Sequence, residues 1–313
     1  MILVTGATGF VGQALCEELD RRQIAYLPTS RAPRKGFHMS GEIDGTTDWA
    51  SGLIGVTTVV HLAARVHVMN DVATDPLAAF RAVNVDATLN LARQAAAAGA
   101  RRFVFLSSIK VNGESTNPGK PFTSHDIPQP GDPYGLSKWE AERALVQLGT
   151  QTGMEIVIIR PPLVYGPGVK ANFASMMAWV RRGVPLPLGR VANKRSLVFV
   201  KNLADLILVC AESDGAANRI FLVSDGRDLS IAELLRKLAE GMGRPVRIFP
   251  ISPRLLEAVA RAAGKGAAAR RLLGSLQVDI SDTRSATGWT PPYSVDEGLR
   301  QTVRAFLKDN PRA

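Results

Sequence analysis

The first half of the chain alternates short, continuous apolar runs with longer segments of helical periodicity. Continuous apolar runs indicate strands buried on both faces, which is typical of a parallel sheet covered by helices. Right-handed connections then give an α/β fold, a Rossmann-type doubly wound sheet that binds ligands beyond the carboxyl ends of its strands. The predicted strands are Met1–Thr5, Ile24–Thr29, Thr58–Ala63, Arg102–Leu106 and Glu155–Arg160, and the predicted helices are Val11–Arg22, Phe80–Ala98 and Tyr134–Gly149.

The alternation loosens after about residue 165, where prolines separate shorter elements. We therefore expect a main domain over residues 1–165 and a smaller, discontinuous region over residues 166–313, some strands of which return to the main sheet. The elements expected there are the strands Leu197–Val200 and Ile220–Val223 and the helix Ile231–Gly241, for which Ser230 and Glu233 have capping-box spacing.

The composition is that of an ordinary globular protein, with 46% hydrophobic and 21% charged residues. The pattern contains no secretion signal, and no apolar run reaches the roughly 18 residues of a membrane span. We therefore expect a cytoplasmic protein in which Cys16 and Cys210 are reduced and buried.

The formal net charge is +10, and the excess is concentrated between Arg244 and Arg271, where Glu257 is the single acid. Such an excess favours anionic partners. Nucleic acid is not expected, because neither exposed aromatic residues nor a reading helix is evident in the pattern. A phosphorylated substrate fits better, as does weak association of a basic helix pair at Pro253–Leu276 with an anionic membrane surface.

A glycine-rich turn joins the first predicted strand to the first predicted helix. Gly6, Gly9 and Gly12 would let the backbone turn sharply, approach a pyrophosphate and pack the helix on the strand. The helix N-terminus would offer its N–H groups to the phosphates. Residues 1–165 are therefore predicted to bind a dinucleotide, with Thr8, Phe10 and Val11 in the same loop.

The end of the second predicted strand bears on the choice of cofactor. An acidic side chain there accepts from the ribose 2′-hydroxyl, whereas an arginine suits a 2′-phosphate. Ser30 stands where the acid is expected, and Arg31 follows it. The pattern favours NADP(H), with NAD(H) as the alternative.

Three side chains with complementary chemistry follow the fourth strand and begin the next helix. Tyr134 and Lys138 are four residues apart, so a phenol and an ammonium share one helix face. Ser108, preceded by Ser107, stands at the carboxyl end of a strand. Hydride transfer at a carbinol carbon also needs a proton donor at its oxygen, and we expect Lys138 and the cationic oxidised nicotinamide to lower the pKa of the phenol for that purpose.

These motifs resemble the extended short-chain dehydrogenase/reductases, in particular the nucleotide-sugar epimerase, dehydratase and reductase group. In order, the chain has the glycine loop, His61–Ala64, an asparagine in Val-Asn-Val, the serines, the Tyr/Lys pair and Arg160–Pro167. The resemblance implies that Tyr134 and Lys138 are catalytic with Ser108 and also contact the cofactor. It places further cofactor contacts at Leu62, Ala63, Ala64, Asn84, Ser107, Pro161 and Leu163.

The resemblance also implies a clamp for a nucleotide sugar, UDP-linked in the expected case, mainly within residues 166–313. Arginines suit a diphosphate because they are permanently charged, bidentate donors. The expected substrate contacts are Ser108, Lys110, Tyr134, Asn172, Leu186, Leu188, Arg195 and Arg271, and His67 is a weaker candidate at the mouth of the cleft.

Departures from the family pattern narrow the expected reaction. Ile109 and Lys110 stand where 4,6-dehydratases carry an Asp-Glu pair, so a dehydratase is not expected. The chain resembles most the bacterial reductases that form UDP-N-acetylquinovosamine or -fucosamine for surface polysaccharides. The prediction is therefore a reductase acting at C4 of a UDP-4-keto-6-deoxy-N-acetylhexosamine. The alternative is a UDP-glucose or UDP-N-acetylglucosamine 4-epimerase with tightly bound NAD, and a redox-sensing regulator is a third reading.

Two further expectations concern metals and assembly. No His, Cys and acid cluster has metal-ligand spacing, and His61 at the end of a buried strand is expected to be a core residue, so no metal is predicted. The two long helices, Phe80–Ala98 and Tyr134–Gly149, are candidates for a homodimer contact.

Overall fold

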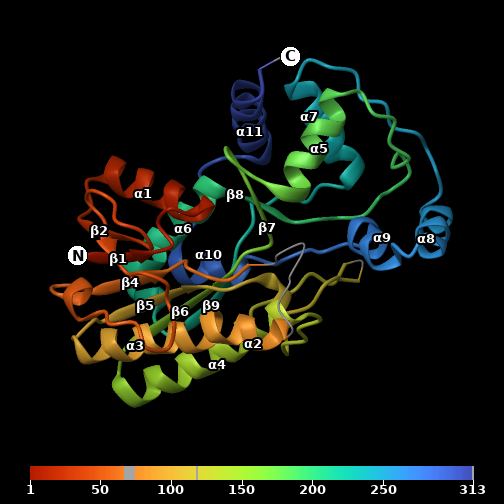
Figure 1. Ribbon diagram of the computed structural model, residues 1–313. Coiled ribbons are helices and arrows are strands. Elements are labelled where there is room, and N and C mark those ends of the chain that lie inside the picture. The colour runs from red at the N-terminus through yellow and green to blue at the C-terminus, as the bar shows by residue number, and fades with distance from the viewer. Residues whose placement is uncertain (67–74, 118, 312–313) are drawn as a thin grey trace.

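In the computed structural model, which describes residues 1–66, 75–117 and 119–311, a parallel sheet forms the centre of the molecule (Figure 1). Its seven described strands have the order β3-β2-β1-β4-β5-β6-β9. The order reverses beside β1, which is the switch point at which doubly wound sheets bind ligands. The predicted fold class is therefore confirmed. The strands are β1 (Ile2–Thr5), β2 (Tyr26–Ser30), β3 (His38–Met39), β4 (Thr58–His61), β5 (Arg102–Leu106), β6 (Glu155–Arg160) and β9 (Arg219–Leu222).

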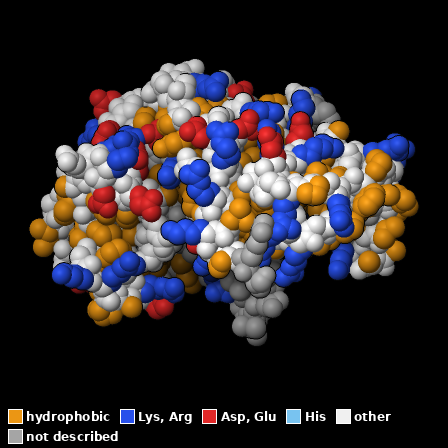
Figure 2. Space-filling view, turned by 90° about the horizontal axis from the view of Figure 1, so that it is seen from above, with side chains coloured by type: hydrophobic (Ala, Val, Ile, Leu, Met, Phe, Trp, Pro, Cys, Tyr) orange, Lys and Arg blue, Asp and Glu red, His pale blue; other side chains and the backbone are white. Residues whose placement is uncertain are grey.

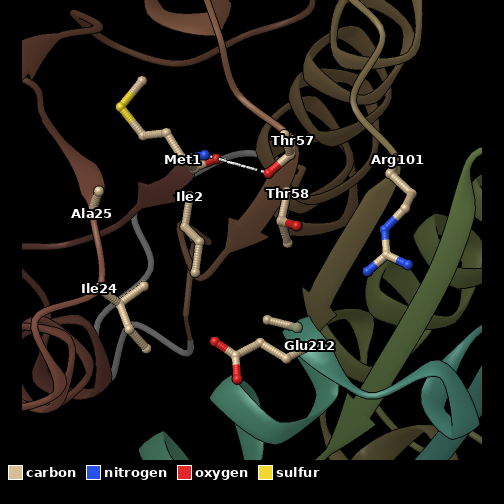
Figure 3. Close-up of a pocket in the computed structure, with 9 residues that line it drawn as sticks. Met1, Ile2, Ile24, Ala25, Thr57, Thr58, Arg101 and Glu212 are labelled. Carbon is tan, nitrogen blue, oxygen red and sulfur yellow. Dashed lines mark hydrogen bonds between the residues drawn. The ribbon is translucent and has the colours of Figure 1, made fainter.

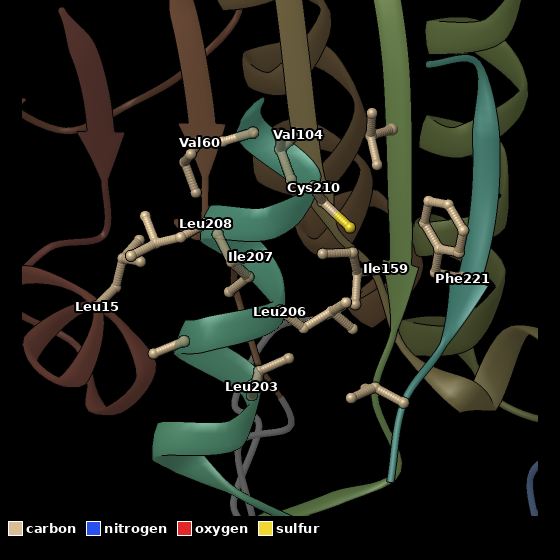
Figure 4. Packing of buried hydrophobic residues seen from close by; sticks show 14 of the residues in the cluster. Leu15, Val60, Val104, Ile159, Leu203, Leu206, Ile207, Leu208, Cys210 and Phe221 are labelled. Carbon is tan, nitrogen blue, oxygen red and sulfur yellow. The ribbon is translucent and has the colours of Figure 1, made fainter. Parts of the chain in front are cut away.

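Helices cover both faces of the sheet (Figure 1). Alternate strand residues point to opposite faces. Val60 and Val104 pack under α6 in one apolar cluster (Figure 4), while Val59 and Phe103 pack against α3 and α4 in another. The helices on the first face are α1 (Phe10–Arg22), α6 (Val200–Glu212) and α10 (Ser281–Thr287), and those on the second are α2 (Pro76–Arg81), α3 (Thr88–Ala97) and α4 (Pro133–Thr152).

The prediction of one regular α-helix over Phe80–Ala98 is wrong. A π-helical segment, Ala82–Ala87, separates α2 from α3. Within it the buried Asn84 side chain donates to the Arg65 carbonyl at 3.1 Å and to the Ser137 hydroxyl at 3.0 Å, and accepts from the Arg65 N–H at 2.9 Å. A single wide turn of this kind is common where a helix must aim one side chain.

The rest of the chain forms a second lobe and also returns to the sheet (Figure 1). Val200 begins α6 rather than ending a strand, and Arg219–Leu222 pairs with β6 at the sheet edge. The capping box of Ser230 and Glu233 is confirmed. The lobe contains the parallel pair β7 (Leu163–Tyr165) and β8 (Leu197–Phe199), with α5 (Ala171–Arg181), α7 (Ile231–Gly241), α8 (Pro253–Ala262), α9 (Gly266–Leu273) and α11 (Val295–Asp309).

Short 3-10 turns complete the described chain at Ala50–Leu53, Ile109–Val111 and Asp214–Ala216. Across the described residues, every helix is too short or too polar to cross a bilayer.

Candidate active site

Four neighbouring strands end at one edge of the sheet, and the predicted site residues follow directly after them. Thr5 of β1 pairs with His61 of β4, and His61 with Phe105 of β5, so their carboxyl ends are level. The glycine loop, the segment after His61, the two serines and the Pro161 segment therefore lie along the same edge. The Ile109 N–H donates to the Pro161 carbonyl at 3.0 Å, which joins the last two segments.

The glycine loop is shaped by its contacts with the chain after β4. Gly6 has φ +68°, and a Cβ there would lie 2.7 Å from the Ala63 nitrogen. A Cβ on Gly12 would lie 2.1 Å from the Gly6 carbonyl oxygen. Both positions need glycine for backbone packing alone, whether or not a ligand binds. The close contact of Gly6 with Leu62 and Ala63 brings two of the predicted cofactor segments together.

Gly9 differs from the other two glycines because packing within the chain does little to require a glycine at this position. It is exposed with φ −79°, and within 4 Å its added Cβ would meet the Gly6 carbonyl oxygen alone, at 3.1 Å. No side chain caps the amino end of α1, and Thr8 is exposed beside it. A bare backbone at an uncapped helix N-terminus fits a dinucleotide pyrophosphate. Phe10 and Val11, in the first turn, are half-buried.

The end of β2 presents a basic rather than an acidic side chain. Ser30 is buried and donates to the Ala32 carbonyl at 2.7 Å, which turns the chain away from the strand. Arg31 is exposed and forms an ion pair with Glu42 at 3.4 Å. An exposed pair of this kind contributes little to stability, so the guanidinium can exchange Glu42 for a ligand phosphate.

His61 is a core residue, as expected. It is 1% exposed and each ring nitrogen has a partner: the Thr5 hydroxyl lies 2.7 Å from Nδ1 and the Thr88 hydroxyl 3.0 Å from Nε2. Burial, reinforced by the charge of Lys138, lowers the pKa of His61 to about 3. The ring is therefore neutral and fixes the turn after β4. His67 lies outside the described residues.

Tyr134, Ser108 and Lys138 converge at the start of α4. Asp132 caps this helix through the Gly135 N–H at 2.7 Å, and Pro133 occupies its first position. The half-buried Tyr134 ring packs edge-on against Phe80, and Ser108 lies near enough to the phenol to lower its pKa. One turn later Lys138 is buried, donates to the Leu106 carbonyl at 2.9 Å and lies 4.4 Å from the Phe105 ring centre.

The expected lowering of the phenol pKa by Lys138 together with the cofactor stays a prediction, and the surroundings of the phenol within the chain act in the opposite direction. Burial, followed by the charge of Asp132, raises the pKa of Tyr134 to about 12, and Ser108 opposes that shift. Lys138 is not among the groups that shift it. Burial lowers the pKa of Lys138 itself to about 7, so its positive charge is only partly present at neutral pH.

A buried charged network below these residues was missed from the sequence. Glu142 and Arg160 are 3% and 2% exposed and form a bidentate pair, at 2.5 Å and 3.0 Å. The Ser107 hydroxyl donates to Glu142, and Arg160 also donates to the Asn112 amide oxygen at 2.9 Å. The spacing of Tyr134, Lys138 and Glu142, each four residues apart on α4, is the signal that could have revealed the carboxylate. Ser107 is thus held by Glu142 beside the site.

Lys110 has a partner within the chain. Its ammonium forms an ion pair with Asp132, the cap of α4. Both side chains are partly buried, and the pair fixes the turn after Ser108 against the helix that carries Tyr134. The expected contact of Lys110 with the sugar stays a prediction. For that contact the ammonium must leave Asp132 or bind Asp132 and the sugar together.

The predicted substrate residues occupy the second lobe in different environments. Asn172 is exposed in the first turn of α5. Leu186 and Leu188 are buried in the apolar cluster of this lobe. Arg195 is half-buried and donates to the carbonyls of Arg271 and Gly274, at 2.7 Å and 3.0 Å, so the two predicted arginines are neighbours. Burial lowers the pKa of Arg195.

The remaining cofactor candidates lie at the same edge of the sheet. Ala64 is half-buried after β4, Pro161 is buried, and Leu163 at the start of β7 is 43% exposed. Their contacts with a ligand, like those of the substrate residues, stay predictions.

A cavity of about 370 Å³ lies at the opposite edge, beside the amino ends of β1 and β4 (Figure 3). Met1, Ile24, Thr57, Arg101 and Glu212 are among its lining residues. Doubly wound sheets bind their ligands at the other edge, and none of the predicted site residues lines this cavity. We do not assign it to the active site.

The fold and this edge define a class of protein: a Rossmann-type, extended short-chain dehydrogenase/reductase with a Ser–Tyr–Lys set. The chain belongs to the NAD dependent epimerase/dehydratase family, whose profile matches residues 2–224. This membership supports a nicotinamide dinucleotide as the cofactor, and the residues of the glycine loop fit one.

Similarity to curated relatives and to solved structures extends over nearly the whole chain. A Vibrio cholerae protein named UDP-glucose 4-epimerase is 48% identical, over 99% of this chain and 97% of its own length. A Pseudomonas aeruginosa GDP-6-deoxy-D-mannose reductase is 29% identical over 98% of this chain and 96% of its own. The structure of a Thermotoga maritima UDP-glucose 4-epimerase with UDP-glucose has a TM-score of 0.77 at 22% identity, covering 98% and 99% of the two chains.

The prediction of a 4-keto-sugar reductase is wrong. The Vibrio cholerae relative, far more similar than the reductase from Pseudomonas aeruginosa, is named as an epimerase. The reductase prediction rested on a resemblance to bacterial reductases of surface-polysaccharide sugars, and a 48% identical relative named as an epimerase overturns it.

Proposed function

We propose that this protein is a 4-epimerase of a UDP-linked hexose, either UDP-glucose or UDP-N-acetylglucosamine. The similarity at 48% identity over 99% of the chain is the observation that carries the proposal. The site is consistent with it, because epimerisation needs one proton-transfer group that works in both directions. This chemistry does not require a metal ion, and the proposal does not use the hypothesis of a redox-sensing regulator.

In this proposal a bound nicotinamide dinucleotide supplies a hydride acceptor and a positive charge at C4 of the sugar. As the phenolate, Tyr134 would take the proton of the C4 hydroxyl as the hydride leaves C4. It would return that proton to the oxygen when the hydride is added back to the opposite face of the rotated 4-keto sugar. Ser108, which lies near the phenol and lowers its pKa, would steer that oxygen. Lys138 is anchored on the Leu106 carbonyl and orients the cofactor ribose. Because the pKa of Tyr134 is raised to about 12, the positive charge of the cofactor is needed to activate the phenol.

The sugar and its diphosphate are proposed to bind across the second lobe. Arg195 and Arg271 would hold the diphosphate, with Asn172 beside it and with Leu186 and Leu188 around the base. One guanidinium nitrogen of Arg195 already donates to carbonyls at the end of α9, and these bonds fix the side chain before substrate binds. Preorganised arginine forks lose less entropy on binding.

The test is direct turnover. Purified protein with added NAD is incubated with UDP-galactose, UDP-glucose or their N-acetylated counterparts, and inversion at C4 is followed by NMR. We expect interconversion without net consumption of the nicotinamide. Tyr134→Phe protein, prepared in the same way, is the control for contaminating epimerase. Absence of interconversion with all four sugars, with NAD and with NADP, would overturn the proposal.

The choice between NAD and NADP has its own test. Ser30 and Arg31 favour NADP(H), whereas the 4-epimerase alternative was expected to hold NAD tightly, so both dinucleotides are compared. If Arg31 binds a 2′-phosphate, Arg31→Ala will weaken NADP binding and leave NAD binding within twofold. An equal effect on both dinucleotides would contradict that role. Titration calorimetry measures both.

A further inference from the structure

The outer face of α8 is apolar and uncovered. Leu255 and Val259, one turn apart, are 55% and 60% exposed, and α8 has no buried side chain. Its inner face holds the helix in place, since Leu256 packs with Leu273 of α9 against the apolar cluster of the second lobe. Phe249, just before α8, is 50% exposed, and Leu272 on α9 is 39% exposed.

Positive charge borders this apolar face. Arg254 and Arg261, both exposed, lie at the opposite margin of the exposed face of α8 from Leu255 and Val259, with Ala258 and Ala262 between them, and Arg270 is exposed on α9. Figure 2 shows hydrophobic side chains gathered at the end of the molecule that α8 and α9 form, with Lys and Arg at the margin. We call Phe249, Leu255, Val259 and Leu272, with Arg254, Arg261 and Arg270, the α8–α9 surface.

We propose that the α8–α9 surface docks on a lipid bilayer that contains anionic headgroups. A short helix with an apolar stripe and a basic margin lies in the plane of such a surface, with its stripe in the headgroup boundary and its arginines on lipid phosphates. Charge complementarity decides the occupant. Arg254, Arg261 and Arg270 suit an anionic surface, whereas a second copy would bring the same excess of positive charge against them, because Glu257 is the single acid of α8 and α9.

Docking through this surface would also place the proposed substrate region close to the bilayer. Arg195 donates to the carbonyls of Arg271 and Gly274 at the end of α9, so the docked helix pair and the proposed diphosphate arginine are bonded to each other. The docked enzyme therefore works at the membrane surface rather than in the bulk of the solution.

The experiment is co-sedimentation of the full chain with phosphatidylcholine vesicles, with and without phosphatidylglycerol. We expect binding to the anionic vesicles that declines as salt rises, because the charges are exposed. Leu255→Glu/Val259→Glu is expected to lower the partition coefficient about tenfold or more. The matched control, Ile54→Glu/Ile127→Glu, changes two exposed residues elsewhere, at 75% and 81% exposure, and should leave it within twofold.

A second pair of variants tests the charges. Arg254→Gln/Arg261→Gln is expected to weaken binding about fivefold for each arginine at low salt. Arg304→Gln/Lys308→Gln removes two exposed charges from α11 and should have a small effect. All variants should retain wild-type circular dichroism and the epimerase turnover of the free enzyme, so failure of docking and failure of the proposed function can be told apart.

Two results would overturn docking. One is wild-type protein that stays in the supernatant with anionic vesicles at low salt. The other is a Leu255→Glu/Val259→Glu variant that binds them as well as wild type does. If that variant instead converts a dimer to a monomer in sedimentation velocity, and wild type ignores vesicles, the surface is a contact between copies and the membrane proposal is wrong.

Discussion

Tyr134 carries the chemistry of the proposed reaction, and its surroundings keep it neutral until ligands bind. The phenol has a pKa raised to about 12 by burial and by Asp132, while burial lowers the pKa of Lys138 to about 7. Close to neutral pH the phenol is therefore protonated and the ammonium is partly neutral. Such an arrangement guards against proton transfer before the cofactor and the sugar are in place.

Replacing Tyr134 with Phe should abolish most turnover and preserve the fold. The ring would keep its edge-on contact with Phe80, but the proton-transfer group would be gone. Positioned acid–base groups contribute roughly a hundredfold to ten-thousandfold, so we expect kcat to fall within that range. NMR turnover and thermal unfolding, measured on the same preparation, check both halves of the prediction. A kcat within threefold of wild type would assign proton transfer to another group.

His61 makes stability depend on pH. Its pKa in the folded protein is about 3, below the ordinary value of 6.5, so the unfolded chain binds the proton more readily between these values. Stability from the neutral ring is present above pH 6.5 and is lost as the pH falls toward 3. Between pH 7.5 and pH 5 the free energy of unfolding should fall by about 2 kcal/mol.

Urea unfolding at the two pH values measures this loss. His61→Gln removes the titration, so its unfolding free energy should depend less on pH by that amount, although the variant is less stable throughout. Equal pH dependence in both proteins would mean that His61 is not the group responsible.

At the scale of elements, the glycine loop separates packing from binding. A Cβ on Gly12 would lie 2.1 Å from the Gly6 carbonyl oxygen, whereas a Cβ on Gly9 would lie 3.1 Å from the same atom. Gly12→Ala should therefore destabilise the protein by about 1–3 kcal/mol, through overpacking. Gly9→Ala should cost about 1 kcal/mol or less.

For binding of the dinucleotide, Gly9→Ala should have the larger effect of the two variants. Gly9→Ala should raise the Kd for the dinucleotide about tenfold or more while the protein stays folded, because its methyl group would stand where the pyrophosphate approaches. Titration calorimetry and thermal unfolding measure the two quantities. Unchanged affinity in Gly9→Ala protein would argue against phosphate binding at this loop.

The buried pair of Glu142 and Arg160 joins α4 to β6. Removing one partner leaves the other buried and uncompensated, so Glu142→Gln should cost about 3–5 kcal/mol of unfolding free energy. The double variant Glu142→Gln/Arg160→Met should lose less than the sum of the single variants, because no unpaired charge remains. Chemical denaturation of the four proteins gives the coupling energy, and additive losses would mean that the two charges do not interact.

Over the whole molecule, the features that could be predicted are those that depend on local pattern. Arg102–Leu106 and Glu155–Arg160 were predicted with their observed bounds because each contains an uninterrupted run of four apolar residues next to a charged one. The start of α6 was misplaced, because Val200 continues the apolar run of β8 and was predicted to end that strand, whereas it begins the helix. Glu142 and Arg160 were missed because single charged residues are usually exposed, and their pairing depends on contacts between distant elements.

The site divides in the same way. The Ser–Tyr–Lys set was found from spacing and position, and the structure brings these residues together. The spacing of Tyr134 and Lys138 could not show whether Lys138 carries a positive charge, because that charge depends on how deeply the side chain is buried. The pairing of Lys110 with Asp132 is likewise a tertiary contact across 22 positions of the chain.

The chain crosses between the two lobes more than once, and a fragment of residues 1–165 should not fold alone. It would lack β9, the partner of β6, and α6, which covers Val60, Val104 and Ile159 (Figure 4). Exposing that apolar layer removes much of the burial that offsets chain entropy. Near-ultraviolet circular dichroism and urea titration should show no cooperative transition, and a sharp transition would contradict this.

The return of β9 to the sheet also limits how such an enzyme can be recombined. Grafting the sugar-recognition lobe of one relative onto the cofactor half of another with one splice would exchange an edge strand and a covering helix along with the specificity loops. Working hybrids would need several junctions that leave those structural segments with their native sheet, so new sugar preferences are more easily reached by exchanging individual loops.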